Sequence, residues 1–243
     1  MSTPPPVPSS RRSFLRKTIA IVPAAALALP AQPQTTANPA PGAALAGAAP
    51  GTYQPAYFHP AEWTFLAAAV ARLVPADANG PGALELGVPE FIDRQMDAIF
   101  GHASRWYMQG PFVESAPEFG YQGMMAPRDV YRAGIAATDT YCKSTLGADS
   151  FAHLTAAAQD TLLKGLEAGS VTLGGVSGKT FFGFLLQNTK EGYLSDPMHG
   201  GNKNAAAWKM IGFPGARADY ADWVGRPGER YPLPPVSIMG PQG

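Results

Sequence analysis

The fold is decided above all by residues 88–100, which read VPEFIDRQMDAIF. The apolar side chains of this segment recur every three or four residues, the spacing that places them on one face of an α-helix. They are Val88, Phe91, Ile92, Met96, Ile99 and Phe100. Pro89 suits the first helical turn, where its missing N–H costs no hydrogen bond, and Gly101 ends the pattern. The segment therefore predicts an amphipathic helix that buries one face.

Four more segments show the same helical spacing. They run from Pro60 to Val74, from Arg128 to Leu146, between Thr155 and Gly169, and from about Lys179 to Thr189. Thr155 is a preferred residue before a first helical turn, while Gly147 and Gly169 suit left-handed helix ends. No segment alternates with a period of two between hairpin turns. We therefore predict an all-α domain of about five helices joined by long ordered loops.

The composition limits what the chain can bind. Its 243 residues, 46% of them hydrophobic, are enough for one main domain. The 18 basic and 18 acidic residues give a net charge of zero, so we expect no nucleic-acid partner. The single cysteine, Cys142, excludes an intramolecular disulfide and thiolate-cluster metal sites. A partner must therefore be recognised through shape and apolar area.

The N-terminus has the features of an export signal. Residues 10–17 read SRRSFLRK, and an apolar run from Ile19 to Leu29 follows. This run is shorter than the roughly 20 residues that span a bilayer, which favours a signal peptide over a transmembrane helix. A twin-arginine export motif is the interpretation we favour, and an arginine pair before an ordinary Sec-type signal is the alternative. The residues that carry the twin-arginine resemblance are Arg11, Arg12, Phe14 and Leu15.

These features divide the chain into four parts. Residues 1–31 form the signal peptide, with Ala28 and Ala31 as competing cleavage positions, and residues 32–52 form a disordered linker rich in Ala, Pro and Gly. Residues 53–225 form the helical domain. Residues 226–243 form an extended tail rich in Pro and Gly that lies on its own domain or on a partner. Because twin-arginine cargo crosses the membrane folded, we expect a periplasmic protein that acquires a cofactor or a folded partner in the cytoplasm.

No cofactor or metal motif stands out in the mature chain. Residues 173–180, LGGVSGKT, resemble a phosphate-binding loop, but Leu173 stands where the motif needs glycine and no strand precedes it. We interpret this stretch as a helix-entry turn. The four histidines are scattered without ligand spacing, so we predict no metal and no covalent haem.

The candidate catalytic residues also have simpler interpretations. Asp93 and Asp97 stand one helical turn apart, and we interpret them as a solvated helix face beside Arg94. Cys142 lies on an apolar stripe, which indicates a core residue rather than a nucleophile. Ser177 and Ser195 lack the Gly-x-Ser-x-Gly elbow that exposes a nucleophile. We therefore predict no catalytic, cofactor-binding or metal-binding residue in this chain.

Two long loops are the candidate interaction surfaces. Residues 102–127 are aromatic, rich in glycine and aperiodic, which predicts an ordered loop whose aromatic side chains form an apolar patch. These side chains are Trp106, Phe112, Phe119 and Tyr121.

The second loop lies within residues 191–214. Asp196 before Pro197 favours a turn, and the glycines and asparagines that follow tolerate left-handed backbone. We expect Trp208, Ile211 and Phe213 to pin the segment to the helices. The alternative is that the loop serves only as a structural turn.

At these residues the chain resembles the small subunit, or subunit 3, of gluconate 2-dehydrogenase. The resemblance extends from about Tyr57 to Gly215, and it includes Pro75, the segments 80–83 and 87–88 and the segment 91–93. At His199 similar chains often carry tyrosine, so a role for that position is not implied. The most specific positions, which the resemblance marks as a candidate partner interface, are Asp196, Pro197, Gly200, Gly201, Asn202, Lys203, Trp208, Gly212, Phe213 and Pro214.

The resemblance implies a role within a membrane-associated enzyme of three subunits. A large FAD-containing subunit oxidises gluconate or a related sugar acid or polyol, and a multihaem cytochrome c passes the electrons on. The small subunit holds no redox centre; it binds the flavoprotein, assists its maturation and escorts it through the twin-arginine translocase. FAD and haem c are thus expected in partner subunits, and this chain meets the membrane only through the complex, at its periplasmic face.

Two other classes of protein stay open at this point. A stand-alone exported enzyme would bring histidines and carboxylates together in a pocket. A free-standing binding or envelope protein would show a closed polar surface, whereas a subunit should expose a large apolar patch. Substrate choice would lie in a different chain.

Overall fold

The computed structural model describes residues 53–113 and 116–240. The predicted export signal at Arg11 and Arg12 and the predicted linker lie outside these residues. The described part of the chain folds into six α-helices without a β-strand, which confirms the all-α prediction. The helices are α2 (Pro60–Leu73), α3 (Val88–Asp97), α4 (Pro127–Tyr141), α5 (Ala156–Ala168), α6 (Gly178–Leu194) and α7 (Ala206–Ile211).

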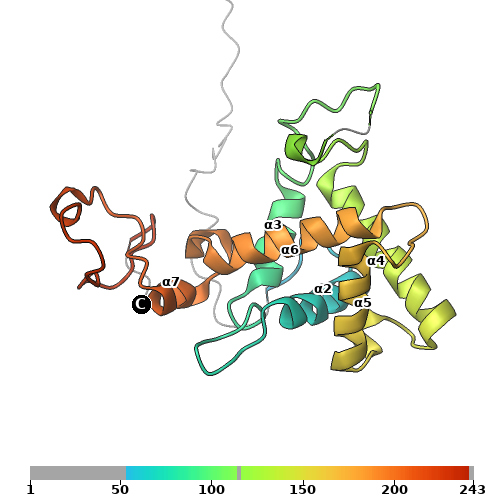
Figure 1. Ribbon diagram of the computed structural model, residues 1–243, viewed down its shortest axis with the longest axis horizontal. Helices are drawn as coiled ribbons and strands as arrows, with labels where there is room; N and C mark the ends of the chain where they lie inside the picture. Colours follow the sequence, from blue (N-terminus) through green and yellow to red (C-terminus); the bar gives the residue numbers. More distant parts are fainter. Residues whose placement is uncertain (1–52, 114–115, 241–243) are drawn as a thin grey trace, which may run out of the picture. The chain divides into compact units, whose positions relative to one another are not determined.

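Helix α6 is the centre of the domain, because it packs against α2, α3, α4, α5 and α7 (Figure 1). Its Phe181 is fully buried and makes aromatic contacts with Phe65 of α2 and Tyr131 of α4. Helices α4 and α6 approach closely at Gly134, where a Cβ atom would collide with the Phe181 ring. The core therefore depends on large aromatic side chains from α6 and on a glycine that makes room for one of them.

Both ends of α5 and the start of α6 follow the sequence signals. Thr155 accepts a hydrogen bond from the Ala158 amide at 3.3 Å and so caps α5, which ends at Gly169 in the left-handed conformation. Ser177 caps α6 in the same way through the amide of Thr180 at 3.2 Å. This cap confirms that residues 173–180 form the entry to a helix.

The predicted helix from Arg128 to Leu146 is present but changes its winding. Helix α4 ends at Tyr141, a π-helical turn continues through Cys142–Leu146, and Gly147 closes it with φ 66°. Cys142 is fully buried in the core, as predicted. Burial, with Asp139 nearby, raises the pKa of the Cys142 thiol to about 11.

Two helix ends and one additional helix differ from the predictions. Helix α3 ends at Asp97 because Ala98 is extended, and this leaves Ile99 54% exposed. Helix α6 continues to Leu194, five residues beyond Thr189, because Gly192 lets it pack on Phe91, whose ring would lie 2.7 Å from an added Cβ. The six-residue helix α7 was not predicted, since it is too short to show a period.

Over the described residues, no helix is both long and apolar enough to cross a membrane.

Candidate functional site

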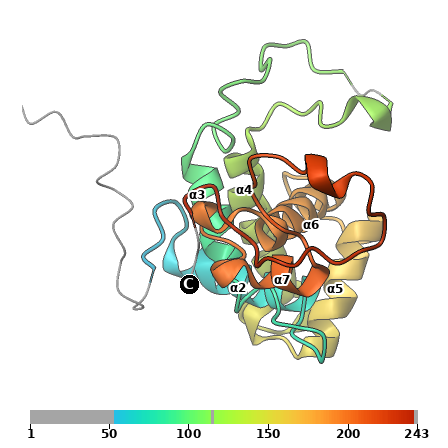
Figure 2. The ribbon, with the colours of Figure 1, turned by 90° about the vertical axis from the view of Figure 1, so that its left-hand side faces the viewer.

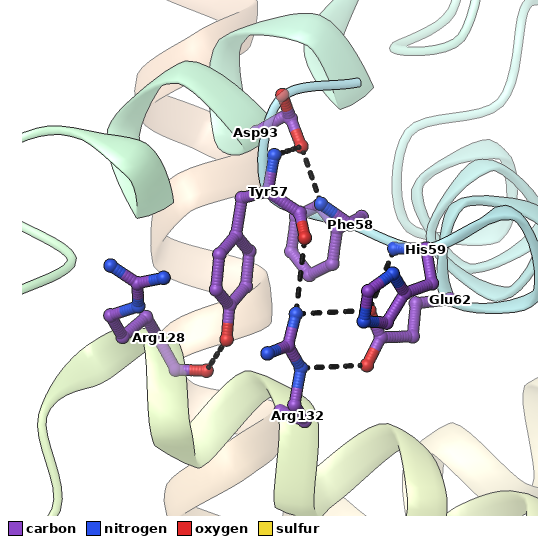
Figure 3. Close-up of polar contacts among 7 residues, drawn as sticks. All are labelled: Tyr57, Phe58, His59, Glu62, Asp93, Arg128 and Arg132. Carbon is purple, nitrogen blue, oxygen red and sulfur yellow. Dashed lines mark hydrogen bonds and ion pairs between the residues drawn. The ribbon is translucent and has the colours of Figure 1, made fainter. Parts of the chain in front are cut away.

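The segment before α2 is held by a buried carboxylate. Asp93 of α3 is fully buried and accepts hydrogen bonds from the amides of Tyr57 at 3.1 Å and Phe58 at 2.9 Å (Figure 3). It also accepts bonds from the Ala56 amide and the Tyr53 hydroxyl, each at 2.7 Å. The interpretation of Asp93 as a solvated residue is therefore wrong: an extended segment far away in sequence covers it. Asp97, one turn later, is exposed as expected.

Two arginines of α4 fix the same segment from the other side. Arg132 donates hydrogen bonds to the Tyr57 carbonyl and to Glu62, both at 3.0 Å (Figure 3). The guanidinium groups of Arg128 and Arg132 lie 4.5 Å and 4.4 Å from the centre of the Tyr57 ring. Tyr57 is buried, which raises the pKa of its hydroxyl, and that hydroxyl donates to the Arg128 carbonyl at 2.6 Å. We call residues 53–58 with Asp93 the N-terminal anchor; it fixes where the chain enters the domain.

The second predicted loop is part of the packed domain. Asn202 is fully buried in a left-handed conformation. Its side-chain nitrogen donates to the Ser195 carbonyl, and its side-chain oxygen accepts from the Ala207 N–H, both at 2.9 Å. Gly201 leaves no space for a side chain, since a Cβ atom there would collide with the Gly192 carbonyl. The Gly-Gly-Asn sequence thus lets the chain turn tightly on the end of α6.

Lys203 connects this loop to α3. Its ammonium group lies 2.8 Å from Glu90, which also pairs with Arg94, and the Lys203 amide donates to the Leu86 carbonyl at 3.2 Å. Glu90 is only 8% exposed, and the two cations balance its buried charge. Neighbouring Gly87 is left-handed, and a Cβ there would lie 2.8 Å from the Gly200 carbonyl oxygen.

Trp208 anchors α7, as predicted. Its indole N–H donates to the Leu194 carbonyl at 2.8 Å, and the side chain is 6% exposed. Phe213 packs edge-on against it, with ring centres 5.0 Å apart, but stays 44% exposed. The prediction that Ile211 also pins the segment is wrong, because Ile211 is the last residue of a six-residue helix and is 56% exposed. Gly212 follows in the left-handed conformation.

Asp196 joins the loop to the C-terminal residues. Its carboxylate accepts the Met198 amide at 3.0 Å, the Ser237 hydroxyl, and the Ile238 amide at 2.8 Å. Partial burial opposes ionisation, yet these three hydrogen bonds lower the pKa of Asp196. Pro197 opens a short 3₁₀ turn that ends at Gly200.

The predicted aromatic loop has a packed base and an exposed tip. Trp106 contacts Phe100, Tyr121 and Phe184 with ring centres 5.7–6.4 Å apart. In contrast, Phe112 and Phe119 are 40% and 70% exposed. The loop projects beyond the ends of α3 and α4 in both views (Figures 1 and 2). Sequence reasoning missed further exposed members of this surface, which are Tyr107, Val113 and Met124.

The ionisable side chains are dispersed. Across residues 53–113 and 116–240, no group of three or more His, Cys, Asp or Glu side chains is placed to hold a metal ion. A cavity of about 700 Å³ lies between α7 and residues 220–231, lined by Met210, Tyr220 and Trp223 among others. Its wall is mainly apolar and aromatic, with Lys209, Glu229 and Arg230 as its charged members.

These features define an all-α domain in which a glycine- and asparagine-rich loop is packed into the domain and a separate aromatic loop is exposed. The family comparison agrees: the model of gluconate 2-dehydrogenase subunit 3 matches residues 60–215, and the chain belongs to this family. This identifies it as a subunit-type protein of a dehydrogenase complex. No match was found among curated proteins or among solved structures.

Proposed function

We propose that this chain is the non-catalytic small subunit of a membrane-associated, FAD-dependent dehydrogenase of the gluconate 2-dehydrogenase type. It binds the flavoprotein subunit, assists its maturation and escorts it through the twin-arginine translocase to the periplasmic side. FAD and haem c belong to the partner subunits. Family membership supports the place in such a complex, and the twin-arginine pattern at Arg11 and Arg12 supports the route.

The observation that carries the proposal is the exposed apolar surface of the aromatic loop. Tyr107 is 82% exposed, and Phe119 and Met124 are each 70% exposed. Aromatic residues and methionine are enriched in the cores of protein interfaces, where they supply large contact area. Exposed apolar side chains gathered in one loop mark an interaction site rather than an inert surface.

The base of the loop is ordered before any partner arrives. The Arg128 amide donates to the Gly101 carbonyl at 3.1 Å, and the Tyr121 hydroxyl donates to the Met125 carbonyl at 3.0 Å. Trp106 stacks on Phe184 of the central helix. Binding therefore orders fewer groups, which lowers its entropic cost.

Co-purification tests the proposal. The tagged chain is expressed with its genomic neighbours, and flavin absorbance and mass spectrometry report whether a flavoprotein is captured. We expect a FAD protein to be captured from the native host, and its export to stop when Arg11 and Arg12 are both changed to lysine. A flavin-free monomer from the native host would overturn the proposal in favour of a free-standing exported binding or envelope protein.

A matched pair of variants locates the interface. Phe112→Ser combined with Phe119→Ser removes apolar area from the loop, and we expect at least about a tenfold loss of capture. Leu146→Ser is the control, since Leu146 is 44% exposed in the turn after α4. Equal capture by all three proteins would place the interface elsewhere on the chain.

A further inference from the structure

The loop between α2 and α3 carries an Asn–Gly pair at its tip (Figure 1). Asn79 is exposed, and Gly80 follows it. The base of the loop is closed by the hydrogen bond from the Ala83 amide to the Val74 carbonyl at 2.8 Å. Across the tip, the Asp77 amide donates to the Gly80 carbonyl at 3.1 Å. The loop is therefore an ordered turn that presents Asn79 to water.

An asparagine that precedes glycine is open to attack by its own backbone. The nitrogen of the next residue attacks the side-chain carbonyl carbon, and a glycine, which has no side chain, hinders this approach least. Asn79 is the only asparagine of the sequence that precedes glycine. Asn38 precedes Pro39, whose nitrogen carries no hydrogen to give up. The sequence therefore singles out Asn79 as the reactive asparagine.

Asp77 brings a carboxylate to both groups that this reaction changes. Its Oδ1 atom accepts the Gly80 amide at 3.2 Å and the Asn79 amide at 2.8 Å. Its Oδ2 atom accepts the side-chain nitrogen of Asn79 at 3.0 Å. One carboxylate thus contacts the nitrogen that attacks and the nitrogen that leaves, at the distances that proton transfer requires. The hydrogen bonds from Asn79 also lower the pKa of Asp77, so the carboxylate is ionised at neutral pH and ready to accept a proton.

We propose that Asn79 is a self-modification site, at which the Gly80 nitrogen attacks the Asn79 side chain and Asp77 accepts the proton of that nitrogen. A bond forms between the Gly80 nitrogen and Cγ of Asn79. The bond from Cγ to Nδ2 then breaks, and ammonia leaves with the proton that Asp77 returns. Water opens the resulting succinimide ring at either carbonyl, which gives aspartate or isoaspartate at position 79. The reaction needs only water and is independent of the proposed function.

The products change a loop that packs on two helices. In the isoaspartate form the main chain runs through the former side chain, so one more carbon separates position 79 from Gly80. Gly80 lies against α7, since a Cβ there would be 2.8 Å from the Met210 sulfur. Beside it, the Tyr193 hydroxyl of α6 donates to the Pro81 carbonyl at 2.9 Å. Both products also place a second negative charge next to Asp77, which repels it.

Peptide mapping of the purified full-length chain tests the site. Trypsin releases residues 73–94, in which Asn79 is the only side-chain amide, so a gain of one mass unit in this peptide reports this position alone. During incubation of the folded protein at neutral pH, we expect this peptide to shift first and to separate by chromatography into aspartate and isoaspartate forms. Earlier deamidation at Asn188, Asn202 or Asn204, or none at Asn79, would overturn the proposal.

Asp77→Ser tests the part played by Asp77. Serine keeps a hydrogen-bond acceptor in the turn but does not take up the amide proton at neutral pH. We expect deamidation at Asn79 to slow at least about tenfold in this variant, and to keep its parent rate in Asp97→Ser, which changes an exposed aspartate of α3. An equal or faster rate in Asp77→Ser would overturn the role of Asp77.

The same comparison in urea separates the turn from the local sequence. Once the turn is unfolded, Asp77 is no longer held against the Gly80 amide, so we expect the parent chain and Asp77→Ser to react at the same rate. If the tenfold difference persists in urea, it arises from the neighbouring sequence, and the assignment to the folded turn is overturned.

Discussion

At the scale of single residues, two aspartates organise this domain by collecting backbone amides. Asp93 accepts three amides and a tyrosine hydroxyl, and Asp196 accepts two amides and a serine hydroxyl. A carboxylate taken from water keeps its charge at low cost only when several donors replace the lost hydration. Both residues join segments that are far apart in sequence, so both act as ties between elements rather than as reactive groups.

The first prediction concerns Asp93. Asp93→Ala leaves the amides of Tyr57 and Phe58 without a partner in a buried site, so we expect the free energy of unfolding to fall by about 3 kcal/mol. Asp97→Ala, on the exposed face of the same helix, should change it by less than about 0.5 kcal/mol. Urea unfolding followed by circular dichroism measures both. Similar losses in the two variants would show that the anchor contributes no special stability.

The second prediction concerns the reactivity of Cys142. Because burial raises its pKa to about 11, the thiol stays protonated at pH 8 in the folded protein. We expect negligible reaction with a thiol reagent at that pH in buffer, and full reaction of one thiol per chain in denaturant. Rapid labelling of the native protein would contradict the buried position.

At the scale of elements, the close contact between α4 and α6 sets the packing of the domain. Gly134 on α4 faces Phe181 on α6, whereas Gly183, two residues further along α6, has no heavy atom within 4 Å of the position of a Cβ. The two glycines therefore serve different purposes. Gly134 makes room for a neighbouring side chain, and Gly183 only weakens the helix that contains it.

The third prediction follows from this contrast. Gly134→Ala should destabilise the domain by about 2 kcal/mol, because the Phe181 ring must move in a packed core. Gly183→Ala should stabilise it by about 0.5–1 kcal/mol through better helix propensity. Thermal unfolding of the two variants beside the parent protein reads out the opposite signs. A loss of stability at both positions would mean that Gly183 also packs against a neighbour.

Local sequence signals predicted where the helices lie better than they predicted the contacts between the helices. The periods in residues 60–74 and 88–100 and the caps Thr155 and Gly169 follow from short-range rules, and helices are present there, although α3 already ends at Asp97. Asp93 and Asp97 look alike in the sequence because a helical period cannot show that residues 53–58 cover only the first. Ile211 was misplaced for a related reason: whether an apolar residue is buried depends on where a short helix ends.

At the scale of the whole domain, the exposed apolar side chains gather mainly in two regions, the aromatic loop and residues 210–213 with the C-terminal residues 216–240. Sequence composition predicted the first, because aromatic residues gather in a segment without helical period. It did not predict the second, since Met210 and Ile211 look like ordinary core residues until α7 and residues 216–240 are placed. Two separate apolar regions fit a subunit with a large contact area.

The fourth prediction concerns the isolated subunit. Its exposed aromatic loop should bind a hydrophobic fluorescent dye at neutral pH while the protein remains fully folded. Phe112→Ser with Phe119→Ser should reduce the fluorescence by about half, since residues 210–213 and 216–240 keep their own exposed apolar side chains. Leu146→Ser should leave the signal near the parent value. Equal dye binding by all three folded proteins would show that the loop is not an accessible apolar surface.

The N-terminal anchor also decides how the domain carries a mechanical load. A force that pulls on the chain ahead of Tyr53 first reaches the four hydrogen bonds to Asp93 and the hydrogen bond from Arg132 to the Tyr57 carbonyl. These bonds share the load and pass it to α3 and α4, so the first turn of α2 is spared. The anchor therefore acts as a mechanical clamp. A folded domain that is pulled by its N-terminal end would be held through α3 and α4 and would not begin to unfold at α2.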